Sequence, residues 1–131
     1  MKCPHDLSAL EVRESDGAVS FSCETCKGSW LPYRHIEALQ YLPLQFPAEK
    51  FRQLIVEGAL ADTTLCCPSG CGLLTSTQVA TIQLDWCQHC KGVWFDGEEL
   101  TKSMHLYVKK DTSSAWSSVD IIGALITALY S

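Results

Sequence analysis

The chain has 131 residues, of which 47% are hydrophobic and 19% charged, and its net charge is −5. This composition excludes a disordered chain, and the acidic balance argues against non-specific nucleic-acid binding, which depends on Lys and Arg contacts to phosphate. No charged-then-apolar leader precedes Cys3, and the longest apolar run, 121–130, is about half of a membrane span, so we expect a cytoplasmic protein. In a reducing compartment the eight cysteines indicate metal or redox sites rather than disulfides.

A 64-residue repeat organises the sequence. The pattern Cys-x-x-Cys-Lys-Gly-x-Trp at 23–30 recurs at 87–94, and Cys3-Pro4 recurs at the same offset as Cys67-Pro68. Similarity decays after the tryptophan. The sequence therefore predicts a duplicated module that begins with Cys-Pro and ends with the Cys-x-x-Cys pattern.

The first unit is predicted to form a β-hairpin followed by a short helix. Residues 10–13 and 18–21 flank an Asp-Gly turn, which is a strong hairpin signal. After Trp30, apolar residues at helical spacing extend to Leu42, where Pro43 interrupts the pattern.

A second helix is predicted over 48–60, within the segment between the two units. The second unit has one strand at 73–75 and another at 79–86, where apolar and polar side chains alternate towards Cys87. Asp96 is a suitable N-cap for a following helix, with Glu99 completing a capping box.

The end of the chain is predicted to be a polar linker and a short apolar helix capped by Ser118. The fold class expected is small α+β, stapled by metal, with two tandem hairpin units each followed by a helix and a short C-terminal helix. The boundaries expected are 1–42 for the first unit with its helix, 43–62 for a helical spacer, 63–108 for the second unit with its helix, 109–118 for the linker and 119–131 for the last helix.

The cysteine spacing predicts two zinc ions per chain, because a tetrahedral site needs four soft ligands and units this small need a staple. In the second unit the predicted ligands are Cys67, Cys71, Cys87 and Cys90. The first pair is one residue longer than usual, and Cys66 in place of Cys67 is an alternative.

The first unit offers only three cysteines for its predicted zinc ion, Cys3, Cys23 and Cys26. Asp6 occupies the position of a fourth thiolate, and a carboxylate oxygen is an acceptable zinc ligand. His5 and His35 are the alternatives, since imidazole is a commoner ligand. We expect Trp30 and Trp94 each to cover the metal site of its own unit and to seed the core.

These motifs resemble the transcription factor IIB type zinc ribbon of small bacterial proteins. The match lies in Cys-Pro-x-(Cys/Asp), a hairpin, and Cys-x-x-Cys-x-Gly-x-Trp, and it covers 3–40 and 66–106. The tail Trp94-Phe95-Asp96-Gly97 follows the family, whereas Trp30-Leu31-Pro32-Tyr33 lacks its aspartate and glycine. The resemblance supports Asp6 as a ligand and implies a zinc-binding protein, often with added helical or membrane segments.

The leading functional hypothesis is a non-enzymatic adaptor or assembly protein. We expect a protein partner or self-association through 119–130, because this segment is apolar almost all round. Packing of that helix back onto the hairpin units and peripheral membrane contact are the alternatives for it. Nucleic-acid binding is a second hypothesis, disfavoured by the acidic charge, and thiol redox chemistry a third, disfavoured because neither Cys-x-x-Cys lies in a βαβ context.

Overall fold

The computed structural model describes residues 1–15, 18–41, 45–80, 82–97 and 121–125. Its strands are β1 (Glu11–Ser15), β2 (Ala18–Ser22), β3 (Ser29–Leu31), β4 (Ala59–Cys66), β5 (Leu73–Val79), β6 (Ile82–Trp86) and β7 (Val93–Phe95). Its helices are α1 (Tyr33–Ala38), the 3-10 turn η1 (Leu39–Tyr41) and α2 (Ala48–Glu57), and 121–125 are also helical. The fold is a small α+β arrangement with an antiparallel sheet.

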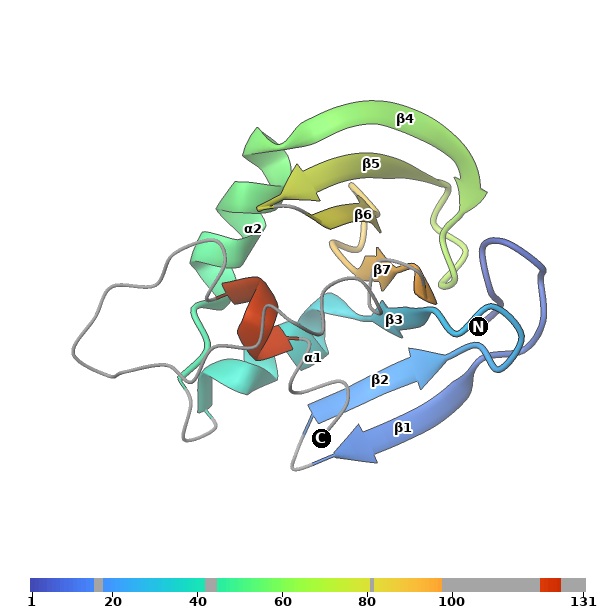
Figure 1. Cartoon of the computed structure of the whole chain (residues 1–131), viewed down its shortest axis with the longest axis horizontal. Coiled ribbons are helices and arrows are strands. Elements are labelled where there is room, and N and C mark those ends of the chain that lie inside the picture. The colour runs from blue at the N-terminus through green and yellow to red at the C-terminus, as the bar shows by residue number, and fades with distance from the viewer. Residues whose placement is uncertain (16–17, 42–44, 81, 98–120, 126–131) are drawn as a thin grey trace.

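All seven strands belong to one sheet, in the order β1-β2-β3-β7-β6-β5-β4. The predicted hairpin of the first unit is confirmed as β1 and β2, which pair antiparallel with Val12 opposite Phe21. The two halves of the sheet meet where β3 pairs antiparallel with β7 (Figure 1). Each half therefore supplies one strand of the pair, β3 and β7, that joins the halves into a continuous sheet.

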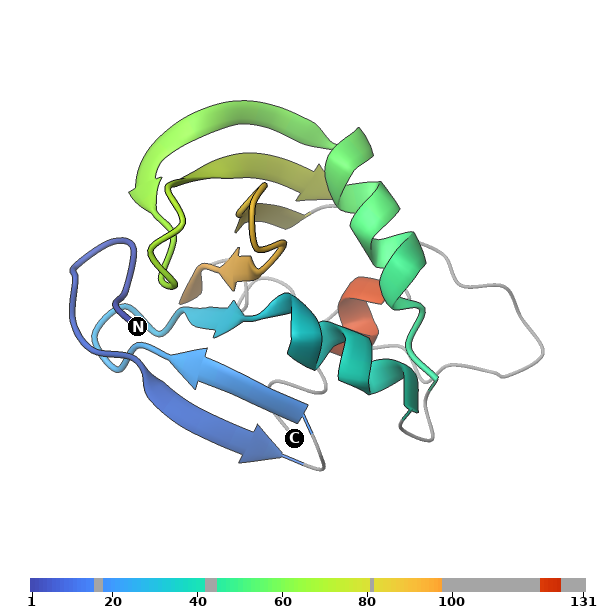
Figure 2. The ribbon, with the colours of Figure 1, turned by 180° about the vertical axis from the view of Figure 1, so that it is seen from behind.

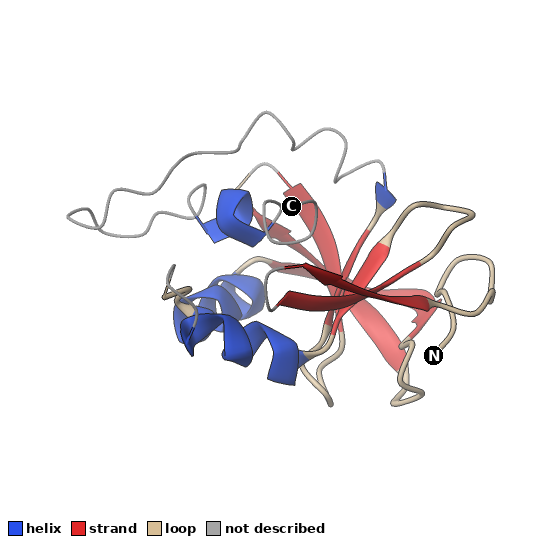
Figure 3. Cartoon of the chain, turned by 90° about the horizontal axis from the view of Figure 1, so that it is seen from below, coloured by secondary structure: helices blue, strands red, loops and turns tan. Residues whose placement is uncertain are grey.

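The two faces of the inner strands serve different parts of the molecule. Side chains alternate along a strand, so Trp30 and Trp94 share one face while Leu31, Val93 and Phe95 share the other. The tryptophans are buried together with Cys3, Cys23, Leu74, Cys67 and Cys87. The second face packs against the helices, which gather on one side while the cysteine-bearing loops lie at the other (Figures 2 and 3).

Helix α2 is fixed to the sheet at its C-terminal end. The buried hydroxyl of Thr77 on β5 donates a 2.6 Å hydrogen bond to the carbonyl oxygen of Ile55. A Cβ on Gly58 would lie 2.1 Å from the carbonyl oxygen of Gln78, so the backbones of helix end and strand touch. Phe51 and Ile55 of this helix enter the main core, which sets the position of its exposed face.

Residues 121–125 are part of that same core. Ile121, Ile122 and Leu125 are fully buried among side chains of α1, α2 and the sheet. The described part of the predicted C-terminal helix therefore packs back on the chain, which was the alternative to docking on a partner. Residues 98–120 and 126–131 lie outside the described part of the chain. They include the linker predicted at 109–118, the rest of the last helix predicted at 119–131, and all of the helix predicted after Asp96 except its first residue, Gly97.

Two sequence predictions of helices and strands need correction, and two strands were missed. Helix α2 ends at Glu57, and residues 59–62 of the expected helical spacer begin strand β4, because Gly58 ends the helix against β5. The strand expected at 73–75 extends to Val79 as β5, and the strand expected over 79–86 is shortened to β6 at 82–86, because the chain turns at Ala80 with a φ of 56°. The short strands β3 and β7 were not predicted. Within the described residues no helix has the length and apolarity to cross a membrane.

Candidate metal centres

Four cysteines of the second unit converge on one point. The sulfur atoms of Cys67, Cys71, Cys87 and Cys90 all lie within 4.8 Å of one another. The Sγ atoms of Cys67 and Cys90 are 3.7 Å apart. Four thiolates at about 2.3 Å from a zinc ion in tetrahedral geometry are separated by about 3.8 Å. The cluster therefore has the donor type, the number of donors and the spacing that zinc requires.

The first unit forms a matching cluster with one oxygen ligand. Cys3, Asp6, Cys23 and Cys26 also bring one ligand atom each to within 4.8 Å of the others. The Sγ atoms of Cys3 and Cys26 are 3.5 Å apart. Both clusters can thus hold a metal, and their composition is consistent with zinc. Direct ligation by each of the eight residues stays a prediction.

The Cys-x-x-Cys loops that close the two clusters, here called the second knuckles, are built alike. The amide of Lys27 donates to the carbonyl of Cys23 at 2.9 Å, and the amide of Lys91 donates to the carbonyl of Cys87 at 2.8 Å. Both lysines have a left-handed backbone conformation, with φ of 65° and 64°. This turn aims both sulfurs of each pair at the same point, which explains why the sequence pattern repeats so closely.

Asp6 is held in place by its neighbour Ser8. The Ser8 amide donates to Asp6 Oδ1 at 2.9 Å, and its hydroxyl donates to the same oxygen. The Ser8 hydroxyl and then its amide lower the pKa of the Asp6 carboxyl to about 2. Asp6 Oδ2 lies 3.5 Å from Cys23 Sγ. The carboxylate is therefore ionised, as a metal ligand must be, and stands beside the thiols.

The alternative ligands proposed from the sequence lie elsewhere among the described residues. His5 Nε2 is 2.6 Å from Asp96 Oδ1, so this imidazole pairs with the other unit. His35 packs near the ring of Phe21, with centroids 6.3 Å apart. Cys66 is exposed at the end of β4. The converging clusters contain none of these three residues.

Within each cluster the thiols are not equivalent. Burial raises the pKa of Cys3 to about 12 and also raises that of Cys90. For Cys23 and Cys87 burial acts in the same direction, but hydrogen bonds from the knuckle backbone outweigh it and lower the pKa. Cys23 and Cys87 are therefore readier to form thiolates than Cys3 and Cys90, from which metal binding must displace protons.

Each of the two tryptophans packs against the unit to which it does not belong. A Cβ on Gly28 would lie 2.3 Å from Cζ2 of Trp94, and a Cβ on Gly92 would lie 2.3 Å from Cζ2 of Trp30. Each indole ring thus rests on the knuckle glycine of the other unit. Both rings are buried in the cysteine-lined core as expected. The prediction that each ring covers the metal site of its own unit was wrong, because each packs on the knuckle glycine of the other unit.

Asp96 adds a second link between the units. Its Oδ1 accepts a 3.0 Å hydrogen bond from the indole N–H of Trp94 and also contacts His5 of the first unit. The position equivalent to Asp96 in the repeat is Pro32, whose side chain has no hydrogen-bond acceptor. Accordingly, the buried indole N–H of Trp30 finds no hydrogen-bond partner among the described residues. Within the described part of the chain, the contact of Asp96 with the tryptophan and with the other unit is seen in one half of the repeat only.

Comparison with known proteins supports one of the two units. The sequence model of the transcription factor zinc-finger family matches residues 66–105, which include all four cysteines of the second cluster. This match supports a zinc ribbon in the second unit. No curated protein and no solved structure matches the chain.

Proposed function

We propose that this chain is a non-enzymatic zinc protein with two zinc ribbons, in which residues 1–42 form a diverged copy of the ribbon at 63–108. The observation that carries the proposal is the closed set of four ligand atoms in each cluster. Structural zinc sites are closed in this way, whereas catalytic sites keep one position for water or substrate. The 64-residue repeat and the matching knuckles support the relation between the units.

The proposed role is that of an adaptor or assembly protein held rigid by its two metal sites. The shared sheet and the exchanged tryptophans support it, because they join both ribbons into one body that presents a fixed surface. Residues 121–125 are buried in the core, so we place partner binding on other surfaces than this part of the last helix. Nucleic-acid binding is not favoured, since the chain is acidic.

The test is the zinc content of the intact chain and of two matched variants. Native mass spectrometry is expected to find two zinc ions in the full chain and one in each of Cys26→Ala and Cys90→Ala. A full chain with one zinc ion, unchanged in Cys26→Ala, would contradict the proposal for the first unit and leave the second ribbon alone.

A separate prediction concerns the structural role of the two zinc ions. Because both sets of four ligand atoms are closed, removing zinc is expected to unfold the chain, whereas removing a catalytic metal would leave a folded but inactive protein. Circular dichroism before and after addition of a chelator measures this. A chain that loses both zinc ions and keeps its fold would contradict a structural role for the metal.

A further inference from the structure

Three glycines of the described part of the chain lie where the two units touch. They are Gly28, Gly92 and Gly97, here called the seam glycines. A Cβ built on any of them would lie 2.3 Å from an atom of the other unit, and its three nearest neighbours beyond the adjacent residues all belong to that unit. Only glycine allows so close an approach, so these contacts exist only when both units are in place.

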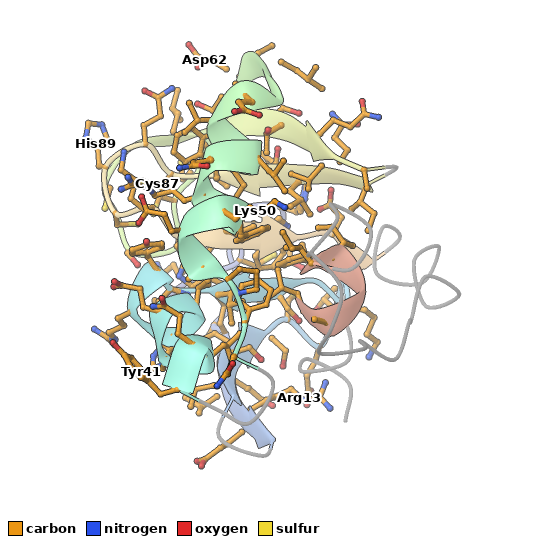
Figure 4. All side chains as sticks on the ribbon, turned by 90° about the vertical axis from the view of Figure 1, so that its left-hand side faces the viewer. Arg13, Tyr41, Lys50, Asp62, Cys87 and His89 are labelled. Carbon is orange, nitrogen blue, oxygen red and sulfur yellow. The ribbon has the colours of Figure 1, made fainter. Side chains whose placement is uncertain are left out.

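The contacts of the seam glycines are made on the knuckles that close the two metal clusters. The amide of Cys23 donates to the carbonyl of Gly28 at 3.0 Å, and the amide of Cys87 donates to the carbonyl of Gly92 at 3.0 Å. Two of the seam glycines therefore end the loops that carry the second cysteine pair of each cluster. Figure 4 shows the loop of the second unit, in which Cys87 is buried and His89 is exposed.

Each second knuckle leads directly into the strand that covers the other one. In the second unit Cys90 is followed by β7, whose Trp94 rests on Gly28. Gly97 comes just after β7, and a Cβ there would lie 2.3 Å from the carbonyl oxygen of Cys26. The first unit is built in the same way through β3. A knuckle that is fixed by its metal therefore holds in position the residues that pack on the other knuckle.

The seam contributes free energy only when both knuckles are folded. Structural zinc supplies much of the folding free energy of units this small, so a chain with one zinc ion has one unfolded knuckle. The rings of Trp30 and Trp94 are fully buried in the folded chain, and one of them then lacks the knuckle on which it rests. The second metal therefore restores the seam contacts as well as its own cluster.

From these observations we infer that the seam glycines couple the two metal sites, so that zinc bound in one cluster raises the zinc affinity of the other. The inference rests on the proposed function, which supplies two structural zinc sites. Coupling between two sites is reciprocal, and we expect a factor of about ten or more. Chains with one zinc ion are then scarce, and the rigid body of the proposed adaptor forms only with both metals in place.

Zinc titrations of the full chain measure the coupling, in competition with a chelator that changes colour on binding zinc. The natural sequence gives the product of its two association constants. Cys90→Ala gives the constant of the first site alone, and Cys26→Ala gives that of the second. The coupling factor is the natural product divided by the product of these two constants. A coupling factor of about ten or more is expected, and a factor of one would overturn the inference.

Gly97→Ala tests whether the seam carries the coupling. Its methyl group meets the first unit, so it is expected to lower the coupling factor by about fivefold or more. In the Cys26→Ala background the first knuckle is unfolded and the clash is absent. There the zinc affinity of the second site should stay within about twofold of its value without Gly97→Ala. A coupling factor that Gly97→Ala leaves unchanged would overturn the inference.

Gly58→Ala is the matched control for a general loss of stability. Its Cβ would lie 2.1 Å from the carbonyl oxygen of Gln78, so the clash is as tight but lies between α2 and β5, away from both knuckles. It is expected to lower stability and to leave the coupling factor near its natural value. An equal fall of the coupling factor in Gly58→Ala and Gly97→Ala would overturn the role of the seam.

The zinc content of the natural sequence separates this inference from the proposed function. Two bound zinc ions with a coupling factor of one refute the coupling and leave the two zinc ribbons intact. A full chain that binds only one zinc ion refutes both, because it has no second site to couple.

Discussion

Trp30 and Trp94 lie directly opposite each other in the antiparallel pair formed by β3 and β7. They are also equivalent positions of the 64-residue repeat, so the strand pairing relates the two units by a local pseudo-twofold axis. Because each ring rests on the knuckle glycine of the other unit, neither metal cluster is packed by its own unit alone. The two units should therefore fold as one.

The first prediction concerns these glycines. Gly92→Ala places a methyl group 2.3 Å from the Trp30 ring, and Gly28→Ala does the same to Trp94. Each is expected to lower the free energy of unfolding by about 1–3 kcal/mol, as overpacking of a tight core does. Because the clash lies between units, denaturant unfolding of the zinc-loaded protein should keep a single transition.

Gly70 is the control for the glycine variants. No atom lies within 4 Å of a Cβ built there, and its φ of 85° is one that asparagine tolerates. Gly70→Asn should therefore change stability little. Two separate transitions in Gly92→Ala would show that the units unfold independently and that the crossed packing matters less than the geometry implies.

The second prediction concerns the buried segment 121–125. Ile122 is fully buried, so Ile122→Ala is expected to cost about 2–4 kcal/mol of stability. Leu60→Ala, at a position that is 58% exposed on β4, is the matched control and should cost far less. Thermal melting measures both. An unchanged melting temperature for Ile122→Ala would mean that this segment leaves the core in solution and is free to dock elsewhere.

Much of the geometry of the candidate metal sites could be predicted from the sequence, because each knuckle is formed by residues close together in the chain. The turn that brings Cys87 and Cys90 to one point is formed by consecutive residues, and the repeat marks it twice. Asp6 was predicted because it stands where a Cys-Pro-x-Cys spacing would place a fourth thiolate, and the structure brings its carboxylate to the three thiols of the first unit.

The arrangement of the units could not be predicted, because it depends on contacts distant in sequence. Strands β3 and β7 have three residues each, too few for a period-2 pattern to be recognised. The strand β4 continues directly from α2, and its side chains at Ala59 and Leu60 fit the helical spacing that precedes them. The partnership of Trp30 with Gly92 has no local signal at all.

The third prediction concerns His35 and pH. Burial, with a smaller effect of Arg34, lowers the pKa of this imidazole below its ordinary 6.5. The folded chain therefore binds the proton less readily than the unfolded chain. The stability that neutral His35 contributes is present above about pH 6.5 and is lost as the pH falls below it.

Denaturant unfolding of the zinc-loaded protein at about pH 7.5 and about pH 6 tests this. His35→Gln should lose less stability between the two values than the natural sequence does. His89→Gln, at an exposed knuckle position, controls for general effects of removing a histidine. An equal loss in His35→Gln and the natural sequence would refute a contribution of His35.

The last prediction concerns the oxygen ligand of the first cluster. Three thiolates and one carboxylate are a harder donor set than four thiolates, and zinc binds thiolates well, so a chelator should remove zinc from the first cluster before the second. Asp6→Cys should slow that first release, and Asp6→Ala should speed it by leaving one position open. His5→Ala is the informative control. It removes the alternative ligand and the 2.6 Å contact with Asp96, yet it should leave the rate of release near that of the natural sequence. Cobalt(II) substitution gives an independent measure, because thiolate-to-cobalt absorption should rise in Asp6→Cys. Faster zinc release in His5→Ala, together with an unchanged release rate in Asp6→Ala, would show that the fourth ligand is the imidazole of His5 and not the carboxylate of Asp6.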